Sequence, residues 1–308
     1  MFNCDVTAID LTPMPLLSAD DMTTASLSPS TDTSVVEKPL FGIPEWLLQI
    51  NDDISRSLER GTNIRQLFAT GGYGRGELSL YSDIDILLLM PHDIDADTNK
   101  KIDNLVAILW DIGLEPALSV RSVSDCLEAA LDHTIASALL EARLLIGNDA
   151  LQDVPHQIVN NQWSPRAFFD VKINEAKARY LQHNATEYNL EPNIKTAPGG
   201  LRDIHIIGWV TKRYFRVSKL YDLVQQDFLT EKEFDELSFA EDYLWQIRHY
   251  LHELTGRNEN KLLFDYQREI AQLMGYEPQP DDQPNDSVER FMRDYYRCAM
   301  QISTLSEC

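Results

Sequence analysis

A glycine-rich turn between two apolar segments constrains the fold of this chain more than any other feature. Residues 64–70 alternate apolar and polar side chains, which predicts a β-strand. Gly71 and Gly72 follow directly, and a turn without side chains lets backbone N–H groups approach a phosphate closely. A short helix over residues 74–80 would point its N-terminus at the same phosphate. Residues 82–90 then predict a second strand, nearly continuous in Leu and Ile and therefore buried.

Two acids, Asp83 and Asp85, lie inside this second apolar strand. Because strand side chains alternate, both acids point to one face, with Cα atoms about 6.5–7 Å apart. Two buried carboxylates repel each other and lose hydration, so a cation must offset the cost. Arg75 is the only basic residue between Arg65 and Lys100. Mg²⁺, with Mn²⁺ as an alternative, suits the pair, since it is usually held by one or two carboxylates and the phosphates of a substrate.

The order of these features resembles the signature of the DNA polymerase β-like nucleotidyltransferases, in which a glycine turn precedes an Asp-x-Asp strand. Here Asp83 follows Gly72 by eleven residues. The longer string Gly-Gly-Tyr-Gly-Arg-Gly-Glu-Leu, followed by Ser-Asp-Ile-Asp, resembles the PII uridylyltransferase/uridylyl-removing enzymes of bacterial nitrogen control. The resemblance implies transfer of UMP from UTP to a tyrosine of the PII signal protein, with release of pyrophosphate. It implies a metal site at Asp83 and Asp85 and a nucleotide site at Gly71, Gly72, Arg75 and Ser82.

A third strand is expected over residues 115–121. The resemblance implies that this strand carries a third acid, which contacts a metal ion and accepts the proton of the attacking hydroxyl. Glu115, at the entrance of the strand, is the candidate catalytic acid. Ser119 is the alternative occupant of the position that other branches fill with Asp. The identity of the general base therefore stays open.

The chain divides by pattern into three parts. Residues 1–39 are rich in Ser, Thr, Asp and Pro and predict a disordered tail. Residues 40–149 alternate helices and strands, ending in a long helix from Ser122 to Ile146, and predict a catalytic domain with a small mixed sheet. Residues 150–308 carry only helical patterns. The fold class is therefore α+β: a polymerase β-like nucleotidyltransferase domain followed by an all-helical domain that closes the cleft.

A second glycine pair, Gly199 and Gly200, opens a helix in this helical part. Such a start would direct free N–H groups outward, with Lys195 and Arg202 beside them. The run Pro-Gly-Gly-Leu-Arg-Asp-Ile resembles the segment that follows the catalytic domain in PII uridylyltransferases. We therefore expect these four residues to bind the nucleotide from the opposite wall.

Composition limits the partners and the location. The net charge of −22 repels a phosphate backbone, which argues against a nucleic-acid partner. Four scattered cysteines without a Cys-x-x-Cys pair indicate reduced thiols and a cytoplasmic protein. No apolar run approaches the length of a membrane span, so no membrane partner is expected.

Three alternatives stay open. A related transferase could use ATP, because nothing in the glycine turn reads the base. The chain could also be a truncated, non-catalytic regulator that binds the nucleotide or PII. Transfer to a small molecule fits the long helical half poorly. The uridylyl-removing hydrolase activity is not expected, because the resemblance places it in a separate His-Asp domain whose histidines and acids have no counterpart here.

Overall fold

The computed structural model describes six stretches of the chain: residues 66–90, 96–111, 116–182, 189–215, 220–280 and 283–307. The expected tail over residues 1–39, the catalytic candidate Glu115 and the first residues of the first expected strand lie outside the described residues.

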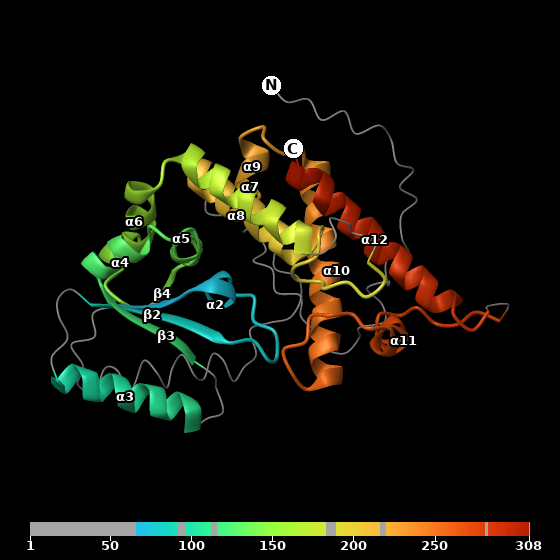
Figure 1. Ribbon diagram of the computed structural model, residues 1–308, viewed down its shortest axis with the longest axis horizontal. Helices are drawn as coiled ribbons and strands as arrows, with labels where there is room; N and C mark the ends of the chain where they lie inside the picture. Colours follow the sequence, from blue (N-terminus) through green and yellow to red (C-terminus); the bar gives the residue numbers. More distant parts are fainter. Residues whose placement is uncertain are drawn as a thin grey trace, which may run out of the picture.

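A four-stranded mixed sheet forms the centre of the first half (Figure 1). Its strands are β1 (Gln66–Ala69), β2 (Ile84–Met90), β3 (Pro116–Ser122) and β4 (Arg143–Gly147), in the spatial order β3-β2-β1-β4. Strand β1 runs antiparallel to both β2 and β4, whereas β2 and β3 are parallel. The α+β class and the small mixed sheet are therefore confirmed.

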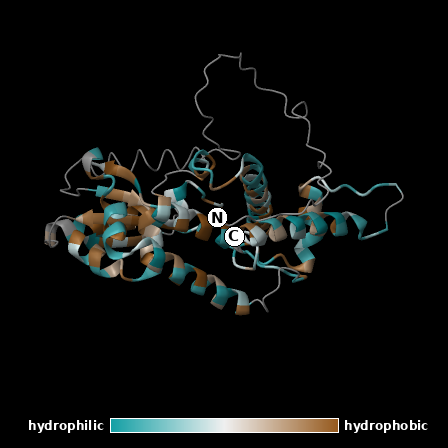
Figure 2. Ribbon diagram, turned by 90° about the horizontal axis from the view of Figure 1, so that it is seen from above, coloured by the Kyte–Doolittle hydropathy of each residue, from teal (hydrophilic) through white to brown (hydrophobic). Residues whose placement is uncertain are grey.

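Alternation along the strands divides their side chains between two hydrophobic clusters, one on each face of the sheet. Helix α3 (Ala96–Asp111) covers one face, where Leu67, Ile86 and Leu88 pack. The other face, with Phe68, Leu87 and Leu89, packs against the helices that follow β3 (Figure 1). Hydrophobic residues dominate the strands, while the helices carry both colours of the hydropathy scale (Figure 2).

The predicted long helix from Ser122 to Ile146 is wrong. A capping box does start a helix at Ser122, whose Oγ accepts the Asp125 N–H at 3.1 Å. This helix, α4 (Val123–Ala129), ends at Ala129. Asp132 caps a second helix, α5 (His133–Leu140). The apolar segment after it becomes β4, because the outer edge of β1 offers backbone hydrogen bonds that a helix there would leave unmade.

The short helix after the first strand also begins earlier than expected. Helix α2 spans Gly71–Arg75 and ends at Gly76, whose φ of 78° is left-handed. The glycine pair is therefore the first turn of the helix, and the predicted helix over residues 74–80 is displaced toward β1.

After β4, the described chain contains helices and one isolated bridge between Asn193 and Lys261. The elements are a 3₁₀ turn (Asp149–Leu151), α6 (Val154–Gln162), α7 (Pro165–Gln182), α8 (Leu201–Phe215), α9 (Asp222–Gln225), α10 (Glu231–Thr255), α11 (Phe264–Leu273) and α12 (Asp286–Glu307). None of the helices in the described part of the chain combines the length and hydropathy needed to span a bilayer.

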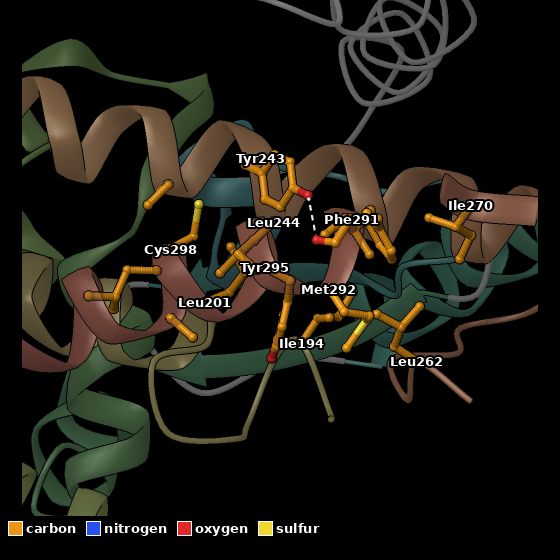
Figure 3. Close-up of a cluster of buried hydrophobic side chains, with 14 of the residues drawn as sticks. Ile194, Leu201, Tyr243, Leu244, Leu262, Ile270, Phe291, Met292, Tyr295 and Cys298 are labelled. Atoms are coloured by element: carbon orange, nitrogen blue, oxygen red, sulfur yellow. Dashed lines mark hydrogen bonds between the residues drawn. The ribbon is translucent and has the colours of Figure 1, made fainter. Parts of the chain in front are cut away.

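The helical half has its own core between α8, α10, α11 and α12. Tyr243 and Leu244 of α10 meet Phe291 and Tyr295 of α12, and the Tyr243 hydroxyl donates to the Phe291 carbonyl at 3.3 Å (Figure 3). A second core joins the halves, because Phe168 of α7 and Trp209 of α8 belong to the cluster that covers the sheet. Side chains on both sides of residue 149 thus share one hydrophobic core.

Candidate active site

The two acids stand at the start of β2. Asp83 immediately precedes the strand and is exposed, whereas Asp85 is its second residue and is half-buried. Both fall in the same alternation as Leu87 and Leu89, which face the helices of the second half. Burial, followed by the charge of Asp83, raises the pKa of the Asp85 carboxyl above its ordinary value. The two carboxylates therefore face the same side of the sheet and repel each other.

Gly71 lies directly against Asp85. Its φ is +54°, and a Cβ at this position would stand 2.3 Å from Asp85 Oδ2. The Thr70 N–H donates to the Asp85 carbonyl at 3.0 Å, which fixes the turn to the strand. Thr70 gives no side-chain cap to the helix that starts at Gly71 and Gly72. The contact that only glycine permits thus places uncapped backbone beside a carboxylate.

Arg75 is held inside the protein by two carboxylates. Its Nε donates to Glu77 Oε2 at 2.5 Å and its Nη1 to Glu141 Oε1 at 2.5 Å. Trp209 Nε1 also donates to Glu141 Oε1. Although burial disfavours the charged guanidinium, these carboxylates raise the pKa of Arg75. Arg75 therefore ties α2 to α5 and, through Trp209, to α8, and its charge already has partners.

Glu77 and His205 continue this buried network. His205 Nε2 lies 3.5 Å from Glu77 Oε2. Burial lowers the pKa of His205 to about 3, so its ring is neutral at physiological pH. Burial opposes ionisation of Glu77 as well, but Arg75 and His205 together lower its pKa to about 2. No sequence pattern predicts this contact, because the two residues belong to distant motifs.

The helical half brings further cations to the acids. Burial lowers the pKa of Lys195 to about 8, and the charges of Arg248 and Arg202 act in the same direction, against Asp83. Burial likewise lowers the pKa of Arg248 to about 10, again with Asp83 opposing. Lys195 was expected at the site. Arg248, from the middle of α10, was missed, because an arginine on a long helix carries no motif.

The remaining predicted residues of the second motif are Arg202, Gly199 and Gly200. Arg202 lies over the Trp209 ring, 5.2 Å from its centre, and burial lowers the pKa of its guanidinium. The expectation that Gly199 and Gly200 direct free N–H groups outward is wrong. The Gly199 N–H donates to Asp203 Oδ2 at 2.7 Å and the Gly200 N–H to the Ala197 carbonyl at 2.9 Å. A Cβ on Gly199 would stand 2.1 Å from the Ala299 carbonyl, so this glycine serves the packing of α12.

The last predicted site positions are Ser82 and those on the strand β3. Ser82 Oγ accepts the Ser79 N–H at 3.2 Å and Arg248 Nη2 at 3.3 Å. On β3, Ala117 pairs with Asp85 and Ser119 pairs with Leu87, so neither neighbour on this face is an acid. Within the described residues, no group of three or more His, Cys, Asp or Glu side chains is placed to hold a metal. Asp83 and Asp85 are thus the candidate metal ligands that the described residues offer.

A family model described as a nucleotidyltransferase domain matches residues 49–145, the stretch that contains the glycine turn, Asp83 and Asp85. The fold and this match show that the chain contains a nucleotidyltransferase domain. A second family model, described as GlnD PII-uridylyltransferase, matches residues 167–308.

Curated relatives narrow the class. The chain is 83% identical to the bifunctional uridylyltransferase/uridylyl-removing enzyme of Psychrobacter arcticus, over 100% of this chain and 37% of the relative. It is 84% identical to the enzyme of that name from Psychrobacter cryohalolentis, over 100% of this chain and 36% of the relative. For the Acinetobacter baumannii enzyme the identity is 51%, over 86% of this chain and 33% of the relative. The chain belongs to this family and spans about a third of the length of these relatives.

Proposed function

We propose that this chain transfers UMP from UTP to a tyrosine of the PII signal protein in a Mg²⁺-dependent reaction that releases pyrophosphate. The observation that carries the proposal is the Asp83 and Asp85 pair against Gly71, inside the stretch matched by the nucleotidyltransferase model. The name of these relatives, uridylyltransferase, supports UTP as the donor. In this reaction the tyrosine oxygen bonds to the α-phosphorus while the bond to the pyrophosphate oxygen breaks.

The donor set fits Mg²⁺, with Mn²⁺ as the alternative ion. Asp83 and Asp85 would supply hard oxygen ligands, and because burial and then the charge of Asp83 raise the pKa of Asp85, a bound cation would stabilise the charged pair. Mg²⁺ is commonly held by one or two carboxylates while the substrate phosphates fill the remaining positions. When bound, the ion would lower the pKa of the incoming phenol and neutralise charge developing at phosphorus.

The nucleotide would lie between the turn and the helical half. Gly71 and Gly72 offer uncapped backbone, and Lys195 and Arg202 add positive charge from the other side. Arg75 acts through the position of α2, because two carboxylates occupy its guanidinium. Gly199 and Gly200 would not bind the nucleotide through their N–H groups, since these groups are hydrogen-bonded within the protein. The general base is left unassigned.

We also propose a cytoplasmic location and no nucleic-acid partner. Cys126 and Cys298 are buried free thiols, which suits a reducing compartment. The net charge of −22 disfavours binding to a polyanionic backbone.

Mass spectrometry of PII after incubation with the chain, Mg²⁺ and labelled UTP tests the proposal. The expected result is a UMP adduct on a tyrosine, lost with Asp83→Asn and retained with Asp103→Asn, an exposed acid on α3 that serves as the matched charge control. An equimolar mixture of UTP and ATP separates uridylyl from adenylyl transfer. Nucleotide binding without any adduct would favour the non-catalytic regulator, and full activity of Asp83→Asn would refute the metal assignment.

A further inference from the structure

The segment that leads into Asp83 is fastened to helix α10 at two points. Ser79 Oγ lies 2.8 Å from His252 Nδ1, within hydrogen-bond distance. Arg248 Nη2 donates to Ser82 Oγ at 3.3 Å. Arg248 and His252 are four residues apart, so they occupy the same face of α10, one turn from each other. We call these two contacts the serine clamp.

The α10 side of the clamp is rigidly supported. Ile247 and Leu251 of this helix are fully buried in the core shared with α12, as is Leu244 (Figure 3). His252 is also fully buried, and burial lowers its pKa to about 4, so the ring is neutral at physiological pH. Arg248 Nε donates to Asn260 Oδ1 at 2.9 Å. Both side chains are therefore held by the helical core before they reach the first half.

The other side of the clamp has little packing of its own. Leu80 is 45% exposed and Tyr81 is 47% exposed, so the middle of the segment is not anchored by burial. The Ser82 N–H donates to the Ser79 carbonyl at 3.0 Å, which makes the segment a compact turn. Asp83 follows this turn directly and is itself exposed. The two serine contacts and the Tyr81 ring, whose centre lies 6.3 Å from that of the His252 ring, thus locate the turn against the helical half.

We propose that the serine clamp positions Asp83 beside Asp85 for divalent-ion binding, so that His252 and Arg248 are positioning residues supplied by the helical half. The inference rests on the proposed role of Asp83 as a metal ligand. Outer groups that orient the ligands of a metal commonly change affinity by about ten-fold or more when they are removed. Because the two contacts join residues 173 and 166 positions apart, the clamp would make the Asp83–Asp85 pair depend on a helix far along the chain.

Two measurements on the full chain test the clamp: hydrogen exchange of the backbone amides, and Mn²⁺ binding measured by electron paramagnetic resonance. With His252→Ala we expect faster exchange over residues 79–83 and Mn²⁺ affinity lower by about ten-fold. His252→Asn, whose amide can reach the position of Nδ1, should restore much of both. Ser79→Ala removes the hydroxyl but leaves the Tyr81–His252 ring contact, so it should reproduce the part of the His252→Ala effect that the hydrogen bond carries and add little in the double variant. Glu253→Ala, an exposed neighbour on α10, is the matched control and should leave both readouts unchanged.

The outcomes separate the clamp from the proposed function. Unchanged exchange over residues 79–83 in His252→Ala and Ser79→Ala would overturn the clamp. Faster exchange with unchanged Mn²⁺ affinity would overturn its positioning role. Failure of the rescue by His252→Asn would also count against it, since a merely structural loss follows core volume and not the hydrogen bond. If the wild-type chain shows no Mn²⁺ binding that Asp83→Asn removes, the proposed metal site fails, whatever the exchange data show.

Discussion

Replacing Gly71 with alanine should damage the metal site far more than it damages the fold. The added Cβ would stand 2.3 Å from Asp85 Oδ2 and 3.1 Å from Asp85 Cγ, distances that real Cβ atoms do not tolerate. The neighbour that must yield is a side chain, so the Asp85 carboxylate can rotate away without moving the backbone of β2. The site that Asp85 forms with Asp83 is lost in that movement.

The cost to stability comes mainly from the backbone. Gly71 has φ +54°, and an alanine in the left-handed region costs about 1–2 kcal/mol. For a chain of this size, each kcal/mol lowers Tm by about 2–4 °C. Displacement of one of two carboxylate ligands should cost at least about 1.4 kcal/mol in metal binding, which is a ten-fold loss of affinity.

Gly76 supplies the matched control within the same turn. Its φ is +78°, and a Cβ there would meet nothing within 4 Å. Gly76→Ala should therefore lower Tm by a similar amount to Gly71→Ala while leaving Mn²⁺ affinity close to that of the wild type. Differential scanning fluorimetry without metal and a Mn²⁺ titration of each variant give the comparison.

Two results would refute the reasoning. Wild-type metal affinity in Gly71→Ala would mean that the Asp85 carboxylate takes no part in metal binding. An equal loss of affinity in Gly76→Ala would mean that the turn acts through its general order and not through the close approach of Gly71 to Asp85.

Three further predictions concern charge and pH. Asp85→Asn should raise Tm near neutral pH in metal-free buffer, because the pKa of Asp85 is raised by burial and by the charge of Asp83. The difference in Tm between the variant and the wild type should narrow on acidification, since the wild type gains stability as the Asp85 carboxyl protonates. His205→Gln should flatten the acid side of the stability profile, because burial lowers the pKa of His205 from 6.5 to about 3 and the wild type loses stability progressively between those values; urea unfolding at pH 7 and pH 5 measures the difference. Glu141→Ala should lower the free energy of unfolding by about 3–5 kcal/mol, because Arg75 loses a buried partner, and a urea-derived loss below about 1 kcal/mol would contradict the network.

Features that depend on neighbours in the chain were predictable. The glycine turn, the acidic strand β2 and the strand β3 follow from short patterns. The break between α4 and α5 and the strand β4 were not predicted. The apolar residues of β4 fit a helical period as well as a strand, and only the free edge of β1 decides between them.

The sequence by itself determined the core of the candidate site, because Gly71 and Asp85 are joined by a turn and two short strands that fold locally. Tertiary structure alone decided what surrounds it. Arg248 and His252, on a distant helix, lie within hydrogen-bond distance of the segment before Asp83. Asp203 accepts the hydrogen bond of the Gly199 N–H. Charges and hydrogen-bonding groups far apart in the chain meet only after hydrophobic packing has oriented the helices that carry them, and no short pattern encodes that packing.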